Sequence, residues 1–200
     1  MKLHVFPPSP NARKCLVTTD LASVQLEQIM VDLQAGDQKK PTFLALNPNG
    51  KMPVLEYEDG TTLWESNAIV NRLAAEGESD LWPKTNARYD ILQWQFWEMA
   101  HWAPATTKFL GAHFFQAPID KDAATAEVRG LADVLDGQLN GRDWLVGDAI
   151  TTADISVAST LCYRDICGIP VDGYSNIAGW LDRIESIPAW QKANPAMEVA

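Results

Sequence analysis

The segment at residues 47–73, NPNGKMPVLEYEDGTTLWESNAIVNRL, constrains the fold of this 200-residue chain more than any other stretch. It holds two short β-rich runs, residues 54–57 and 61–64, separated by the hairpin signal Asp59-Gly60. Glu65-Ser66 then precedes apolar residues whose spacing suits one buried helix face, namely Ala68, Ile69, Val70, Leu73 and Ala74. The segment therefore predicts a strand, a tight turn, a second strand and a capped helix.

The residues before this segment predict strand, helix, strand and loop. Residues 3–6 form a short apolar strand, which Pro7-Pro8 must end. Ser9-Pro10 predicts a helix start, with Ser9 as N-cap and Pro10 at the first helical position. Residues 26–33 alternate like a second strand, and residues 35–41 form a polar loop. The apolar face of the first helix is expected to hold Leu16, Val17, Leu21 and Ala22.

After a polar linker at residues 77–86, the rest of the chain predicts helices. Residues 89–115 are rich in aromatic side chains, and Pro104 within them predicts a kink or a break. Thr151 and Asp154 fit a capping box at the start of another helix. Helical spacing also marks three apolar sets: Val128, Leu131, Ala132, Leu135 and Leu139; Ile155, Ala158, Leu161 and Cys162; and Ile177, Trp180, Leu181, Ile184 and Ile187, closed by Pro188.

Charge and composition argue against several classes of protein. A formal net charge of −10 repels the phosphates of nucleic acid, so we expect no such partner. No apolar run approaches the roughly 20 residues that span a bilayer, and the first residues lack the apolar core of a signal peptide. The three cysteines form no CxxC pair and the three histidines lack metal-like spacing. We therefore expect a cytoplasmic protein without membrane association or a metal.

Three motifs together resemble the cytosolic glutathione transferase family. The pattern NPxGKxPxL, a hairpin and then ES at a helix start resemble its glutathione-binding half, and LVGDAITTADI resembles its helical half. PPSPNARK resembles phi-, theta- and bacterial nu-type members, although Ala12 replaces the glycine of the nu-type PNG. The resemblance implies an N-terminal thioredoxin-like α/β domain at residues 1–76, a linker at 77–86 and an all-α domain at 87–200.

In such a protein, Ser9 and Asn11 are the candidate catalytic residues. A thiol with a pKa near about 8.5 is mostly protonated at pH 7, so the site must favour the thiolate. The Ser9 hydroxyl can donate to the sulfur from a helix N-terminus, or it can serve only as an N-cap. The amide of Asn11 can donate to the same sulfur, or it can be an ordinary surface residue. Neither end of Ser9-Pro10-Asn11-Ala12 is cysteine, which excludes a dithiol mechanism there.

The resemblance also implies residues that bind the rest of glutathione. Glu65 would pair with the γ-glutamyl ammonium and Ser66 would bind its α-carboxylate. The alternative is that Ser66 is only a helix cap and Glu65 an ordinary acid before it. Met52-Pro53 resembles the family's cis-proline site, where the backbone binds the cysteinyl unit. Gln38, Lys39 and Lys51 fall where members of the family contact the glycyl carboxylate. The alternative for each of them is an ordinary solvated surface residue.

An electrophile pocket is expected between the two domains. Its candidate residues are Pro8, Trp97, His101, Trp102, Ala105 and Tyr163. Aromatic residues at helical spacing also fit a plain hydrophobic core, and both interpretations stay open here.

The expected function is conjugation of glutathione, as co-substrate, to a small apolar electrophile, or glutathione-dependent reduction of one. Disulfide or peroxide reduction with bound glutathione is an alternative, as is a transferase-like binding protein without turnover. The presence of Ser9, Pro53, Glu65 and Ser66 argues against the last alternative. The resemblance further implies a homodimer and a role in detoxification.

Overall fold

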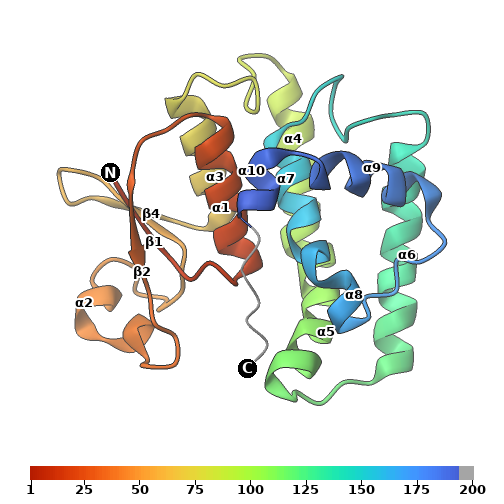
Figure 1. The fold of residues 1–200 in the computed structure, drawn as a ribbon, viewed down its shortest axis with the longest axis horizontal. Coiled ribbons are helices and arrows are strands. Elements are labelled where there is room, and N and C mark those ends of the chain that lie inside the picture. The colour runs from red at the N-terminus through yellow and green to blue at the C-terminus, as the bar shows by residue number, and fades with distance from the viewer. Residues whose placement is uncertain (194–200) are drawn as a thin grey trace. The chain divides into compact units, whose positions relative to one another are not determined.

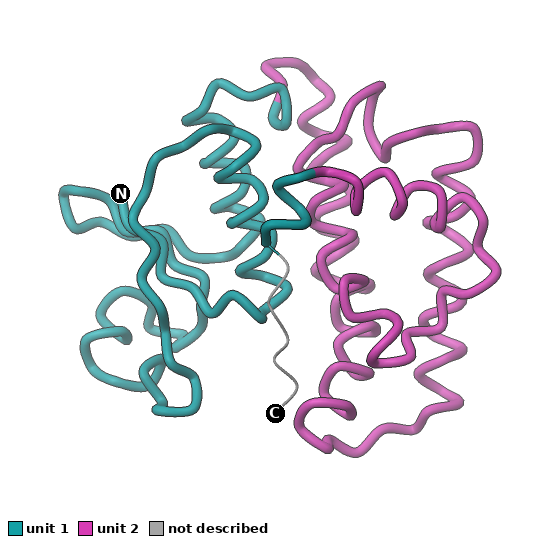
Figure 2. Tube along the Cα trace, viewed as in Figure 1, with its two compact units in different colours: residues 1–82, 188–200 teal, residues 83–187 magenta. Residues whose placement is uncertain are grey.

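The computed structural model describes residues 1–193, which fall into two compact units (Figures 1 and 2). The first unit comprises residues 1–82 and the segment that starts at Pro188; the second comprises residues 83–187. This division differs from the expected boundaries at residues 76 and 87 and from a helical domain reaching residue 200. The segment from Pro188 belongs to the first unit because it packs on α1, where Arg13, which is 1% exposed, donates to the carbonyls of Trp190 at 2.9 Å and Ala193 at 3.1 Å.

The first unit is built on a four-stranded sheet of order β2-β1-β3-β4 within the described residues. β1 (Lys2–Val5) pairs in parallel with β2 (Glu27–Met30) and antiparallel with β3 (Val54–Glu56), which pairs antiparallel with β4 (Thr62–Trp64). The helices of this unit are α1 (Pro10–Leu21), η1 (Asp37–Lys39), α2 (Pro41–Leu44), α3 (Ser66–Glu76) and α10 (Pro188–Lys192). This arrangement confirms the predicted thioredoxin-like domain.

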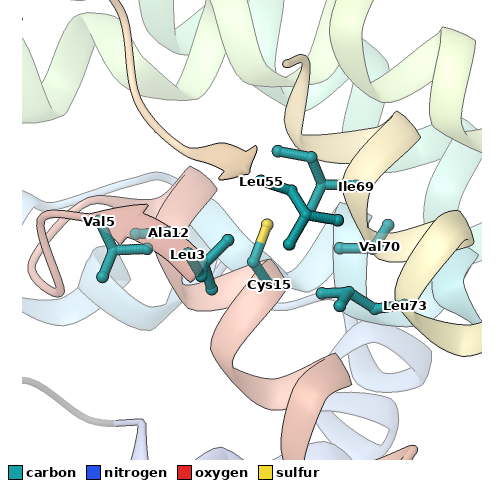
Figure 3. Packing of buried hydrophobic residues seen from close by; sticks show 8 residues of the cluster. All are labelled: Leu3, Val5, Ala12, Cys15, Leu55, Ile69, Val70 and Leu73. Carbon is teal, nitrogen blue, oxygen red and sulfur yellow. The ribbon is translucent and has the colours of Figure 1, made fainter. Parts of the chain in front are cut away.

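Two apolar clusters lie against the opposite faces of the sheet. Successive residues of a strand point to opposite faces, so Leu55 joins one cluster and Val54 the other. The larger cluster joins β1 and β3 to α1 and α3 (Figure 3): Leu3, Val5, Ala12, Cys15, Leu55, Ile69, Val70 and Leu73. The smaller cluster contains Val31 and Phe43 with Val54. α1 and α3 therefore cover one face, and α2 packs on the other.

The second strand is shorter than the predicted residues 26–33. Val31 N donates to Val5 O at 2.8 Å, and β1 ends at Val5, so there is no partner for a longer β2. The Asp32 carboxylate then accepts from the backbone of Gln34 and Ala35 and turns the chain. The sequence analysis also did not predict α2, because a single helical turn is too short to show a repeated spacing of apolar residues.

α1 and α3 approach each other closely at their C-terminal ends. A Cβ atom on Gly77, the residue after α3, would lie 2.1 Å from the carbonyl oxygen of Ala22, so only glycine fits there. The buried side of α1 differs from the predicted apolar face. Val17 and Ala22 are buried as expected, but Leu16 and Leu21 are half-buried, and Arg13, Lys14 and Cys15 lie inside instead.

The second unit is entirely helical in the described residues, as predicted. Its elements are α4 (Ala87–Trp97), η2 (Glu98–Trp102), α5 (Ala103–Phe115), α6 (Lys121–Leu139), α7 (Thr152–Ala158), η3 (Ser159–Tyr163), α8 (Arg164–Cys167) and α9 (Ser175–Glu185). No helix among residues 1–193 combines the length and apolar character needed to cross a membrane.

Local signals in this unit had mixed outcomes. The capping box is confirmed, with Thr151 as N-cap of α7 and Asp154 accepting from its backbone at 2.8 Å. Pro104 breaks the α-helical pattern as expected, but the disruption is the π-helical turn η2 just before it. Proline has no N–H to donate to the previous turn, which favours such a widened turn. Pro188 begins α10, whereas α9 already ends at Glu185.

Candidate functional site

The candidate site in the first unit is built on the N-terminal ends of α1 and α3. Ser9 is the N-cap of α1 and Pro10 its first residue, as predicted. The Ser9 hydroxyl makes no capping hydrogen bond, so the interpretation of Ser9 as a side-chain cap is not supported by the geometry. Both helices exceed ten residues, and the positive ends of their dipoles favour an anion at these N-termini.

A hydrogen bond joins these two N-termini directly. The Ser66 hydroxyl donates to Asn11 Oδ1 at 3.3 Å. Behind it, the buried Lys14 donates from Nζ to Ser66 Oγ at 3.4 Å and to Asn67 Oδ1 at 3.3 Å. Two residues predicted for different parts of glutathione are thus in contact, and one of them, Ser66, also accepts from a lysine that the sequence analysis did not select.

Glu65 has an uncommon backbone conformation. Its φ is +74° and its ψ is 114°, in a region that side chains with a Cβ rarely adopt. Its side chain is exposed. Strain of this kind at the residue before a helix N-terminus is typical of a functional position, because it sets the direction in which the carboxylate leaves the backbone.

The loop before β3 is shaped by the buried Asn47. Its amide donates to Lys51 O at 2.6 Å and its Oδ1 accepts from Asn49 N at 3.0 Å. The Met52-Pro53 peptide that follows is cis, as the resemblance implied. Gly50, with φ +61°, lies so close to Gln38 that a Cβ would be 3.1 Å from its carbonyl oxygen. The loops that carry Gln38 and Lys51 are therefore packed together.

The three candidates for the glycyl carboxylate differ in their surroundings. Gln38 Oε1 is buried without a hydrogen-bond partner, which is an unusual state for a polar atom. Lys39 and Lys51 have exposed side chains. Gln38 Oε1 is an acceptor, so it needs an N–H donor, whereas the two lysines supply the donors that a carboxylate needs.

The candidates for the electrophile pocket have diverse environments. Trp102, Ala105 and Tyr163 are buried, and Trp102 Nε1 donates to Val157 O at 3.1 Å within the helical core. His101 is exposed in a groove of about 370 Å³ with Pro104 and Leu131. Trp97 is half-buried and lines a separate groove with Val134. Pro8 is exposed and belongs to the first unit.

Cys15 is unsuited to be a nucleophile. It is completely buried in the apolar cluster, and this burial raises the pKa of its thiol to about 12. A thiol with such a pKa is protonated at neutral pH, so Cys15 does not supply a thiolate to this site.

Comparison with known proteins agrees with this architecture. Residues 8–76 match the family model for the glutathione S-transferase N-terminal domain, and residues 97–188 match that for its C-terminal domain. Glutathione S-transferase GstB of Escherichia coli (strain K12) is 31% identical over 192 residues, with 92% of each chain covered.

Solved structures give the same result. A glutathione S-transferase from Pseudomonas fluorescens Pf-5 superposes with a TM-score of 0.86 at 33% identity, covering 94% of this chain and 96% of its own. A glutathione transferase from Pseudomonas putida, solved with one glutathione disulfide bound per subunit, gives a TM-score of 0.83 at 27% identity, with coverage of 96% and 89%.

The chain therefore belongs to the glutathione S-transferase family. The predicted family, its two-part fold and the assignment as a glutathione transferase enzyme are confirmed.

The strain at Glu65 gives a testable prediction. Glu65→Gly is expected to be more stable than Glu65→Ala by about 1 kcal/mol or more, since glycine adopts a positive φ without steric cost. Urea unfolding of the two variants measures the difference. Ala68→Gly, at an exposed position of the same helix, is the control and is expected to lose about 1 kcal/mol. Equal stability of the two Glu65 variants would show that this backbone is relaxed.

Proposed function

We propose that this enzyme binds glutathione along the N-termini of α1 and α3 and transfers its thiolate to a small apolar electrophile. The observation that carries the proposal is the 3.3 Å hydrogen bond between Ser66 and Asn11. It brings the candidate residue for the γ-glutamyl end next to a candidate for the sulfur, which are neighbouring parts of one glutathione molecule.

The γ-glutamyl end is assigned to α3. Its α-carboxylate fits the free backbone N–H groups at the helix start, with Ser66 beside them, because a helix N-terminus attracts an anion. The exposed carboxylate of Glu65 is left to pair with the ammonium group. The two charged groups of the γ-glutamyl end thus bind at adjacent residues, the carboxylate at Ser66 and the ammonium at Glu65.

The other end is assigned to the packed loops around Gly50. Gln38 Oε1 is a buried acceptor without a partner, and the N–H of the glycyl unit, rather than its carboxylate, would satisfy it. Lys51 supplies positive charge for the glycyl carboxylate, and the backbone of Met52 binds the cysteinyl unit. Lys39 is a second cation of the same region.

Thiolate formation is assigned to Ser9 and Asn11. Each can donate a hydrogen bond to sulfur, and the α1 N-terminus adds its dipole; all three effects favour the charged form of the thiol. The thiolate then forms a bond to the electrophilic carbon and the leaving group departs with the electron pair. The enzyme contributes a lowered thiol pKa and proximity of the two reactants.

Disulfide reduction is a second candidate, supported by the Pseudomonas putida relative that holds glutathione disulfide. In this reaction the bound thiolate attacks a disulfide, forms a mixed disulfide and releases one thiolate. The thiolate of a second glutathione then attacks the mixed disulfide, forms glutathione disulfide and releases the other substrate thiolate. Assays with a generic aryl halide and with a small dialkyl disulfide would distinguish the two reactions.

We further propose that the protein is a cytoplasmic homodimer that acts in detoxification. Two-fold symmetric pairing is the commonest assembly of soluble proteins and is general in the resembled family. Light scattering at micromolar concentration is expected to give twice the mass of the 22.1 kDa chain. A monomer mass would contradict this proposal and leave the glutathione site unaffected.

Removal of the Glu65 carboxylate tests the binding mode. Glu65→Ala is expected to weaken glutathione binding by about 1.5–3 kcal/mol, the usual contribution of a charged hydrogen bond. Calorimetry on the folded variants measures it, with Glu76→Ala at the other end of α3 as control. Glu76 forms an ion pair at 2.7 Å with the exposed Arg72 and lies at the end of α3 away from the proposed site, so binding should stay unchanged. An unaltered dissociation constant in Glu65→Ala would make Glu65 a surface acid.

The thiolate assignment is tested by Ser9→Ala and Asn11→Ala. Loss of one hydrogen bond to the sulfur is expected to raise the pKa of the bound thiol by about one to two units. Ultraviolet titration of bound glutathione measures this pKa. A shift only in Asn11→Ala would assign the sulfur hydrogen bond to Asn11 and leave the Ser9 hydroxyl without a role toward the thiolate. A shift in neither variant would assign the thiolate to the helix N-terminus alone.

A further inference from the structure

We propose that Asn140 is a site of spontaneous deamidation in the folded protein, and that the structure protects Asn49 from the same reaction. These are the two asparagines of the chain that glycine follows, and a basic residue comes next in both, Lys51 and Arg142. The two sites therefore have matched local sequences and differ in their structure. The inference does not depend on the proposed glutathione chemistry.

Deamidation of an Asn-Gly pair uses only the protein and water. The backbone nitrogen of the glycine loses its proton and attacks Cγ of the asparagine side chain, forming a C–N bond. The bond from Cγ to Nδ2 then breaks, ammonia leaves with that proton, and a cyclic succinimide remains. Water adds to either ring carbonyl and opens the ring to aspartate or isoaspartate. Glycine favours the attack because it has no side chain to restrict the backbone.

Ring closure requires the Asn-Gly peptide to rotate toward the asparagine side chain. Asn140 follows α6 with φ −62° and ψ 114°, and Gly141 has φ +71°, which are the central angles of a type II turn. Arg142 N closes this turn by donating to Leu139 O at 3.0 Å. The central peptide takes no part in the closing bond, so it can rotate while that bond remains.

The groups that react at this site are free. Asn140 and Gly141 are exposed, and within residues 1–193 neither the Asn140 side chain nor the Gly141 N–H takes part in a hydrogen bond. The space beside Gly141 is also open, because a Cβ built there would meet no atom within 4 Å. The cyclic intermediate can thus form without displacing a neighbouring group.

Asn49 is also exposed, but Asn47 holds both of its reacting groups. Gly50 N, the nitrogen that would attack, closes a turn by donating to Asn47 O at 2.9 Å. The side chain that would be attacked donates from Nδ2 to Asn47 Oδ1 at 3.0 Å. Gly50 is crowded as well, since a Cβ there would lie 3.1 Å from Gln38 O. Reaction at Asn49 must therefore break two hydrogen bonds, although the residue is open to water.

The two locations give this difference a consequence. Conversion of Asn49 would place a new carboxylate in the loop before β3, close in sequence to Lys51. Conversion of Asn140 instead places it at the C-terminal end of α6, where the helix dipole disfavours negative charge. The formal net charge of −10 becomes more negative by one in the second unit, and the loop before β3 stays unchanged.

The experiment follows both sites in one sample. The full-length wild-type protein is kept folded at mildly alkaline pH for several weeks, and its peptides are analysed by mass spectrometry for replacement of an amide by a carboxyl group. Asn140 is expected to react faster than Asn49 by about tenfold or more, because reaction at Asn49 breaks two additional hydrogen bonds. Equal rates, or no reaction at Asn140, would overturn the inference.

The same incubation in urea is the matched control. Both sites then keep their Asn-Gly sequence and lose their turns, so their rates are expected to become similar. A difference that persists in the unfolded chain would overturn the inference, because the flanking sequence rather than the structure would separate the two sites.

Two variants identify the source of isoaspartate in the folded protein. Isoaspartate is measured by methyl transfer from labelled S-adenosylmethionine with an isoaspartyl methyltransferase. Asn140→Gln, an exposed change that would require a larger ring, is expected to reduce the signal to background, whereas Asn49→Gln should leave it unchanged. A signal that survives in Asn140→Gln and falls in Asn49→Gln would reverse the assignment and overturn the inference.

Discussion

The packing of α1 against α3 is the interaction on which the rest of the site depends. The two helices share one apolar cluster with β1 and β3, and their C-terminal ends meet where Gly77 leaves no space for a side chain. Their N-terminal ends are joined by the contact between Asn11 and Ser66. Because both helices run from the same edge of the sheet, their positive dipole ends lie together, as the proposed glutathione site requires.

A buried cation in this interface has a cost that the local structure offsets. Removing an ammonium from water is unfavourable unless hydrogen bonds replace its hydration. The bonds from Lys14 to Ser66 and Asn67 are part of that replacement, and both partners lie in the first turn of α3. The same contacts that keep Lys14 inside the protein therefore fix the groups nearest to the proposed ligand.

The sequence was sufficient where the signal is local. Asp59-Gly60 predicted the hairpin, and the Asp59 carboxylate accepts from Thr61 N at 2.9 Å inside that turn. Ser9-Pro10 and the Thr151 capping box marked helix starts through contacts between near neighbours. The order of strands and helices, and with it the location of the candidate glutathione site, followed from such signals together with the family resemblance.

What the sequence could not predict depends on long-range contacts. Charged residues are usually exposed, so nothing in the spacing of Lys14 and Arg13 indicated that α3 and α10 would bury them. The one available indication of burial was that Arg13 and Lys14 lie one turn into α1, between the apolar residues Ala12 and Cys15. The positive φ of Glu65 is likewise imposed by the junction of β4 and α3, since glutamate itself does not favour it.

The hydrogen bonds from Arg13 to Trp190 and Ala193 join residues that are made at opposite ends of synthesis. They therefore affect the order in which the first unit folds. The carbonyls of Trp190 and Ala193 that receive the Arg13 guanidinium are made 177 residues or more after it. Chains leave the ribosome from the N-terminus, and domains generally fold as they emerge. The first unit therefore gains its sheet early but its last helix only after the whole second unit has been translated. A nascent chain of this protein carries an incomplete glutathione-binding half for most of its synthesis.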